Sequence, residues 1–183
     1  MADHGLTLAE IYDAHFEFVW RVLRRLGVPN QDVRDALQDV FVVVHRKLPE
    51  FRGESKVTTW LFGICLRVAS DRRRSAHARR EIATGTDLGA ELPDVGAASD
   101  IERRDAIRLL ERILDEMPEE QRVVFTLFEL EEHSCEAIAE LVGVPLGTVY
   151  SRLRLARKVF KRGLARRQAR EQFSIGAARG EAS

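Results

Sequence analysis

Residues 134–162 read SCEAIAELVGVPLGTVYSRLRLARKVFKR, and this stretch decides the fold of the C-terminal part of the chain. Ser134 can cap a short helix in which Ile138 faces inward. Gly143 can adopt the left-handed conformation that a sharp turn requires, and a basic helix follows it. A short helix, a tight turn and a basic second helix are typical of a helix-turn-helix that reads DNA.

The second of these helices carries a strong positive charge. Between Val144 and Arg170 there are nine Lys or Arg residues and no Asp or Glu. Such a block is typical of a solvated tail or of a surface for a polyanion, and the turn before it favours the polyanion. The apolar stripe predicted to be buried is Val149, Leu153, Ala156 and Phe160. The face left for DNA holds Thr148, Ser151, Arg154, Leu155 and Lys158, with Tyr150 and Arg152 on its flanks.

Composition limits the functions that the chain can have. Its 183 residues have a formal net charge of zero, but Glu91 to Leu141 holds 15 acidic and 5 basic residues. The two cysteines, Cys65 and Cys135, do not have zinc-site spacing and suit a reducing compartment. The sequence lacks an apolar run of membrane-spanning length and a signal-peptide pattern. We therefore expect a soluble, cytoplasmic protein that does not insert into the membrane and that needs neither cofactor nor metal.

The N-terminal part contains three segments with helical periodicity and none that alternates as a strand does. The first runs from Leu8 to Leu26, and Gly27 and Pro29 stop it. The second has apolar positions at Val33, Ala36, Leu37, Val40, Phe41 and Val44. The polar residues of this second segment include Asp35, Gln38, Asp39 and Arg46. The third runs from about Thr58 to about Arg74.

Residues 81–100 have a different composition. They include three glycines, one proline and five acidic residues, and they have no Lys or Arg. This composition cannot bury much surface and predicts a flexible linker. The prediction is an all-α chain of two small helical domains, 8–76 and 104–165, joined by a linker at 77–103 and followed by a disordered tail at 166–183.

A second basic cluster ends the N-terminal domain, at Arg67, Arg72, Arg73, Arg74, Arg79 and Arg80. Trp60 and Phe62 lie upstream of it, beside Lys56, Thr58 and Thr59. Aromatic rings among cations and hydroxyls suit the unstacked bases of a single DNA strand. Trp60 also lies on the apolar face of its helix, so we expect its role to be mostly in the core.

Four stretches of the chain resemble the extracytoplasmic function (ECF) subfamily of the sigma-70 family. DALQDVFVVVHRKL (35–48) is similar to the segment that docks on the RNA polymerase clamp, and FRGESKVTTWLF (51–62) to the promoter-melting segment. The helix through Asp71, Arg72, Arg73 and Arg74 resembles the reader of the −10 element. Residues 117–162 resemble the reader of the −35 element.

The resemblance implies a sigma factor that binds bacterial core RNA polymerase and promoter DNA, with no catalytic residues of its own. The polymerase would be bound at the clamp coiled coil of its largest subunit by Asp35, Gln38, Asp39 and Arg46, and at its flap by the C-terminal domain. The −10 element would be bound and melted by Lys56, Thr58, Thr59, Trp60, Arg67, Asp71, Arg73 and Arg74. The −35 element would be read by Thr148, Tyr150, Ser151, Arg152, Arg154, Leu155 and Lys158. An anti-sigma factor is a further implied partner.

The chain departs from the family pattern at several positions. Most members have Asn where this chain has Arg67, and many have an aromatic residue in place of Val57. Tyr150 and Leu155 stand where basic residues are common. Because neither side chain can make the bidentate guanine contact of Arg, we expect an unusual promoter preference.

Two other functions compete with this interpretation. A stand-alone helix-turn-helix regulator would bind duplex DNA unaided, usually as a dimer on a two-fold site. An enzyme with a DNA-binding tail would need a nucleophile and base, a phosphate loop or a metal site, and we find none in the sequence. Asp35 and Asp39 share a helix face but lack further ligands nearby, so a contact surface is the better interpretation.

Overall fold

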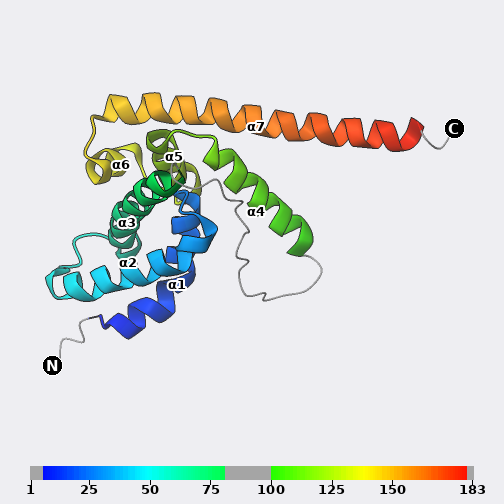
Figure 1. The fold of residues 1–183 in the computed structure, drawn as a ribbon. Coiled ribbons are helices and arrows are strands. Elements are labelled where there is room, and N and C mark those ends of the chain that lie inside the picture. The colour runs from blue at the N-terminus through cyan, green and yellow to red at the C-terminus, as the bar shows by residue number, and fades with distance from the viewer. Residues whose placement is uncertain (1–5, 81–99, 181–183) are drawn as a thin grey trace. The chain divides into compact units, whose positions relative to one another are not determined.

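The computed structural model describes residues 6–80 and 100–180, and within these ranges the chain forms helices and no strand (Figure 1). The chain divides into two compact units, residues 1–103 and 104–183. The prediction of an all-α chain is thereby confirmed. Most of the predicted linker, 81–99, lies outside the described residues. Its two ends differ from the prediction, because helix continues to Arg80 and begins again at Asp100.

Within residues 6–80, the first unit contains three α-helices and two short 3-10 turns. They are α1 (Leu8–Arg25), η1 (Asn30–Asp32), α2 (Val33–Lys47), η2 (Leu48–Glu50) and α3 (Val57–Arg80). Thr7 begins α1 with a reciprocal cap, in which its hydroxyl accepts from the backbone N–H of Glu10 and the Glu10 carboxylate accepts from the backbone N–H of Thr7. Gly27, with φ of 82°, ends it in the left-handed region.

The core of the first unit lies where α1, α2 and α3 pack against one another. All six apolar positions predicted for the second helix are buried. The buried residues of the other two helices are Ile11, Val19, Val22, Leu23, Leu61, Phe62, Ile64, Cys65, Val68 and Ala69. Trp60 is half-buried and its ring lies 4.7 Å from that of Phe51. The proposed role of Phe62 against DNA bases is wrong, because this ring is fully buried.

The second unit contains the predicted helix-turn-helix. Its elements are α4 (Asp100–Asp115), α5 (Glu119–Phe125), the π-helical turn η3 (Thr126–Leu130), α6 (Cys135–Val142) and α7 (Leu146–Gly180). Pro118 precedes α5 as its cap, one position earlier than the first-turn place in which proline is favoured. Ile113, Leu114, Met117, Phe125 and Ala156 form a buried cluster that joins α4, α5 and α7.

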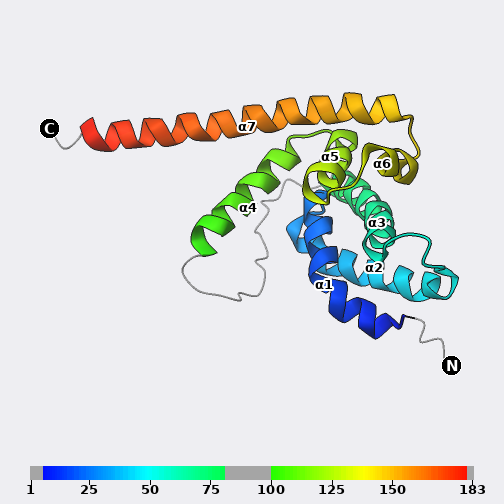
Figure 2. The same cartoon turned by 180° about the vertical axis from the view of Figure 1, so that it is seen from behind.

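Local hydrogen bonds explain why the turn of the helix-turn-helix forms here. The Ser134 hydroxyl accepts from the backbone N–H of Ala137 at 3.2 Å, which caps α6. Gly143 ends α6 with φ of 70° and ψ of 38°, and its N–H donates to the carbonyl of Ala139. Both predictions are confirmed. Helix α7 then packs against α5 and α6, as the front and rear views show (Figures 1 and 2).

Helix α7 is longer than the sequence pattern predicts. The disordered tail predicted at 166–183 differs from the structure, in which the helix continues to Gly180, and only residues 181–183 lie outside the described part. Residues 166–172 read RRQAREQ. Arg, Gln, Ala and Glu are all good helix formers, and no proline interrupts them, so the helix propagates beyond the packed part of the domain.

Two glycines of α7 differ in what surrounds them. A Cβ atom at Gly163 would lie 2.6 Å from Cγ1 of the buried Ile113, whereas one at Gly147 would meet no heavy atom within 4 Å. We predict that Gly163→Ala lowers the free energy of unfolding, because overpacking costs about 1–3 kcal/mol and outweighs a gain in helix propensity of at most about 1 kcal/mol. Gly147→Ala is the matched control and should unfold at the wild-type temperature or slightly above it. Equal melting temperatures of the two variants would contradict the close approach.

Candidate functional site

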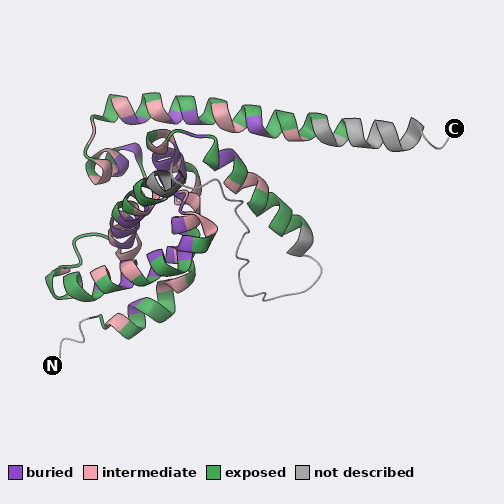
Figure 3. Cartoon of the chain, viewed as in Figure 1, coloured by how far each residue is buried: buried purple, intermediate pink, exposed green. Residues whose placement is uncertain are grey.

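The orientation of α7 is determined by its apolar stripe. Val149, Leu153 and Ala156 are at most 3% exposed, and the buried residues of this helix lie in the half that packs on α5 and α6 (Figure 3). The opposite face is therefore the one that α7 presents outward. The exposed residues on it are Tyr150, Ser151, Arg154, Leu155 and Lys158, and Thr148 beside them is half-buried.

Part of the positive charge of α7 is paired within its own unit. Arg152, whose side chain is 18% exposed, lies 2.6 Å from a carboxylate oxygen of Glu120. Arg157 donates to Glu129 at 2.6 Å and lies over the ring of Phe128, and Arg166 pairs with Glu116. The cations left on the outward face are Arg154, Lys158, Lys161 and Arg162, all exposed. The sequence analysis did not predict these ion pairs, although the acidic stretch before the basic helix indicated that partners for its arginines were available.

A buried arginine holds the turn between α4 and α5. Arg122 is 5% exposed, and its guanidinium donates to the backbone carbonyls of Asp115 and Met117 at 3.2 and 3.3 Å. It also lies 3.3 Å from the Asp115 carboxylate. A buried cation needs such partners because its desolvation is costly. Arg122 thereby ties α5, against which α7 packs, to the turn that precedes it.

The polar face of α2 lies beside an open apolar groove between α1 and α2. Tyr12, Phe41 and Val42 line this groove, together with Gln38 and Arg46. Tyr12 and Val42 are 41% and 43% exposed. Partly exposed apolar side chains with polar residues at their edge are typical of a surface that binds another protein.

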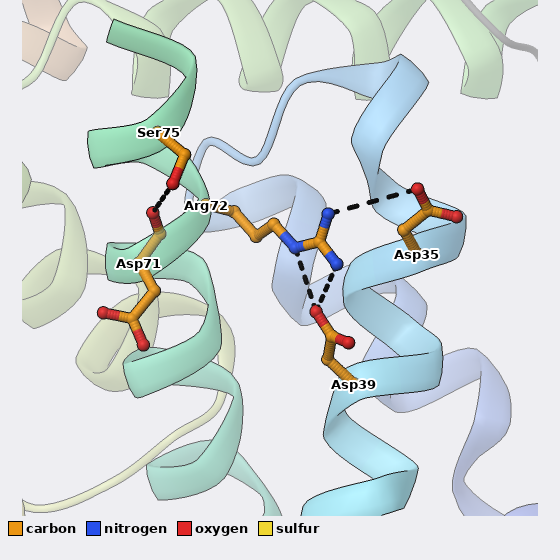
Figure 4. A network of polar contacts seen from close by, with 5 residues as sticks. All are labelled: Asp35, Asp39, Asp71, Arg72 and Ser75. Atoms are coloured by element: carbon orange, nitrogen blue, oxygen red, sulfur yellow. Dashed lines mark hydrogen bonds and ion pairs between the residues drawn. The ribbon is translucent and has the colours of Figure 1, made fainter. Parts of the chain in front are cut away.

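Arg72 links the polar face of α2 to α3, as Figure 4 shows. Its Nε donates to Asp39 Oδ2 at 3.0 Å, a second guanidinium nitrogen donates to the same oxygen, and Asp35 Oδ2 lies 4.0 Å away. The hydrogen bond to Asp39 holds the pKa of Arg72 above its ordinary value. Asp39 and Arg72 were assigned to different surfaces on sequence grounds, and the structure brings them together across two helices.

The residues predicted to contact the −10 element lie on α3, except Lys56, which directly precedes it. Lys56, Arg67, Asp71 and Arg74 are exposed, and Thr58, Thr59, Trp60 and Arg73 are half-buried. Arg74 pairs with Asp71 one turn earlier in the helix, and the Ser75 hydroxyl donates to the Asp71 carbonyl at 3.0 Å. The side chains of Arg79 and Arg80, also in the predicted basic cluster, lie outside the described residues.

The described residues do not form a metal site or a membrane span. Within residues 6–80 and 100–180, no group of three or more His, Cys, Asp or Glu side chains is placed to hold a metal ion. In the same ranges, no helix has the length and apolar character needed to cross a membrane. Cys65 and Cys135 are both buried. Burial, and to a lesser extent the nearby Glu136, raise the pKa of the Cys135 thiol, which makes it a poor nucleophile at neutral pH.

Comparison with known proteins identifies both units. The sigma-70 region 2 model matches residues 11–80, and the sigma-70 region 4 model matches residues 107–159. The ECF RNA polymerase sigma-E factor of Haemophilus influenzae is 33% identical over 143 residues, which cover 73% of this chain and 75% of that protein. The sigma-E factor of Escherichia coli K12 is 35% identical over 140 residues, covering 72% of this chain and 73% of that one.

Two solved structures share the fold at lower identity. CnrH, in complex with the cytosolic domain of CnrY, is similar with a TM-score of 0.62 and 21% identity, over 86% of this chain and 87% of that one. RpoE of Bartonella quintana, in complex with the anti-sigma factor NepR, has a TM-score of 0.61 and 21% identity, over 84% and 96% of the two chains.

A helix-turn-helix with a basic outward face in one unit and a basic helix, α3, in the other are features of a two-part DNA-binding protein. The chain belongs to the sigma-70 family and is a sigma factor of its ECF group. Sigma factors direct RNA polymerase to promoters, and their role is regulatory.

Alanine substitutions of two arginines of α7, Arg152 and Arg154, should have different effects on DNA binding and on stability. Arg154 is exposed on the outward face, and Arg152 is paired with Glu120. We predict that Arg154→Ala lowers affinity for −35 DNA about 5- to 150-fold, with an unchanged melting temperature, because a good base contact is worth about 1–3 kcal/mol. Arg152→Ala should lower the free energy of unfolding by up to about 1 kcal/mol and weaken DNA binding less. Filter binding of the holoenzyme and thermal unfolding of the free chain measure the two effects. The assignment fails if Arg152→Ala weakens DNA binding more than Arg154→Ala does.

Proposed function

We propose that this sigma factor uses four separate surfaces in transcription initiation. The polar face of α2, with Gln38, Asp39 and Arg46, would bind the clamp coiled coil of the largest polymerase subunit. Helix α3 and the residues before it would bind and melt the −10 element. The outward face of α7 would read the −35 element, while other parts of that unit contact the flap. The domain limits proposed are 8–76 and 104–165, with residues between them acting as a linker.

The observation that carries this proposal is the one-sided packing of α7. Its apolar stripe is buried on α5 and α6, while Arg154, Lys158, Lys161 and Arg162 remain exposed on the other side. A helix that follows a tight turn and presents hydroxyl and basic side chains outward has the geometry of a recognition helix in the major groove. The four cations suit phosphate oxygens or guanine edges along its path.

The mechanism needs no covalent chemistry from this chain. Unstacking a base costs a few kcal/mol, and contacts to phosphates and base faces would offset that cost. On the first unit these contacts would come from Arg67, Arg73 and Arg74, with Lys56 at the start of α3. Trp60, which is half-buried, would contribute a contact to one base. Binding to polymerase at α2 would place these groups on the strand that separates.

An anti-sigma factor is the proposed inhibitor. One structural neighbour, RpoE, was solved in complex with the anti-sigma factor NepR, and the other, CnrH, in complex with the cytosolic domain of CnrY. The groove between α1 and α2 offers exposed apolar surface at Tyr12 and Val42. We propose that the chain acts in the cytoplasm, where polymerase is found, and alternates between inhibitor and polymerase.

The alternative of a stand-alone regulator is less well supported, because the chain matches sigma-70 regions on both of its units. Run-off transcription with purified core polymerase separates the two functions. We expect specific initiation from genomic promoter fragments only when the chain is added. The proposal fails if the chain gives no specific initiation on any fragment of a complete promoter library and binds duplex DNA unaided as a dimer.

The polymerase surface can be tested without disturbing the fold. Gln38 and Arg46 are exposed on α2, whereas Asp39 accepts hydrogen bonds from Arg72. The charge reversal Asp39→Arg would therefore perturb the fold as well as the surface. We predict that Gln38→Ala and Arg46→Ala each weaken binding to core polymerase about five- to thirtyfold, as losses of 1–2 kcal/mol do. Their melting temperatures should stay at the wild-type value.

Gln31→Ala is the matched control for these variants, because Gln31 is exposed on the turn before α2. It should bind core polymerase as the wild type does. Affinities can be measured by fluorescence anisotropy of labelled sigma factor. If both α2 variants bind as tightly as the Gln31→Ala control, the polymerase contacts another part of the first unit.

A further inference from the structure

The outward face of α7 contains apolar side chains among its polar ones. Tyr150 is 52% exposed and Leu155 is 39% exposed. Exposed leucines are ordinary on protein surfaces, so exposure by itself indicates nothing. Their position is informative, because Leu155 lies one helical turn after Ser151 and three residues before Lys158, between groups that face DNA in the proposed function. Leu155 is not needed to fill the core, since Val149, Leu153 and Ala156 already form the buried stripe.

The neighbours of Leu155 offer few hydrogen-bond donors. The hydroxyl of Ser151 donates to the backbone carbonyl of Thr148 at 2.9 Å, so its proton is used within the helix. Arg152 forms an ion pair with Glu120, and Arg157 forms one with Glu129. A base edge that meets the row of Gly147, Ser151 and Leu155 therefore meets a hydroxyl acceptor and an isobutyl group. Arg154, on the adjacent row, remains available for a guanine or a phosphate.

In the major groove, only one of the four bases presents an apolar group that could contact the Leu155 side chain. Each base pair presents donors and acceptors there, and the C5-methyl group of thymine is the only apolar group. Guanine and cytosine edges would lose their water opposite leucine and gain no hydrogen bond in return, which is costly. We infer that Leu155 is a specificity-determining residue that selects thymine in the −35 element by contact with its C5-methyl group. This inference rests on the proposed function of α7.

The inference can be tested by selecting the promoters that holoenzyme binds from a library with random −35 sequences. Holoenzyme is assembled from core polymerase and full-length chain, either wild type, Leu155→Ala, Leu155→Met or Leu164→Ala. Leu164 is the matched control, because it is 36% exposed on the same helix but lies beyond the turns that would enter the groove. We expect the wild type, Leu155→Met and Leu164→Ala to select thymine at one common position. Leu155→Ala should lose the preference at that position alone.

Replacing this thymine by deoxyuridine removes only the methyl group. Burying one such group is worth about 0.8 kcal/mol, so the replacement should weaken wild-type binding about three- to fivefold. Leu155→Ala holoenzyme should bind both DNAs equally. Circular dichroism of each variant establishes that the chain is folded, and Leu155→Met gives the same test with a side chain of similar volume.

Two results would overturn the inference, and they differ from failure of the proposed function. Suppose that wild-type holoenzyme binds DNA with deoxyuridine as tightly as DNA with thymidine at every selected position. Leu155 then makes no contact with a thymine methyl group that contributes to affinity. If Leu155→Ala retains the full deoxyuridine penalty, another residue reads it. A wild-type holoenzyme that selects no −35 sequence at all would overturn the proposed role of α7, and with it this inference.

Discussion

The burial of one face of α7 is the constraint on which the DNA-binding surface depends. Val149, Leu153 and Ala156 pack inward, and Ala156 joins the cluster formed by Ile113, Leu114, Met117 and Phe125. Because side chains three and four apart share a face, fixing this stripe also fixes which residues face outward. Gly143 sets where the helix begins, and the missing side chain at Gly163 lets α4 approach closely. The identity of the outward residues then determines what DNA sequence the domain can read.

Part of the positive charge of α7 is neutralised by neighbouring acidic side chains. Acidic residues of the second unit, Glu116, Glu120 and Glu129, pair with arginines of α7. Exposed pairs of this kind contribute little stability, but they reduce the number of cations available to phosphates. Fewer free cations give weaker binding to DNA of any sequence. In the proposed function, a sigma factor with this balance would depend on polymerase for affinity, and its own side chains would contribute selectivity.

Helix periodicity and capping chemistry were sufficient to predict the turn of the helix-turn-helix and most of the buried stripe of α7. The Ser134 cap and the left-handed Gly143 are present in the structure, and Val149, Leu153 and Ala156 are buried as predicted, whereas Phe160 is half-buried. Contacts between distant segments could not be predicted in this way. The bonds from Arg72 to Asp39 join residues 33 positions apart, and periodicity carries no information about such partners. The burial of Phe62 could not be predicted for the same reason. The basic and aromatic residues near it in the sequence indicated contact with DNA, but the packing of the three helices buries its ring.

Site-directed cleavage of promoter DNA tests the central claim most directly, namely that α7 and α3 contact two different promoter elements. Cys65 and Cys135 are buried, so an iron chelate can be attached selectively to a new cysteine at exposed Lys158 or Arg74. In the open complex with polymerase, we predict that the chelate at Lys158→Cys cuts the DNA around the −35 element. The chelate at Arg74→Cys should cut around the −10 element. Cleavage of the same nucleotides from both positions, or none near −35 from position 158, would contradict the account.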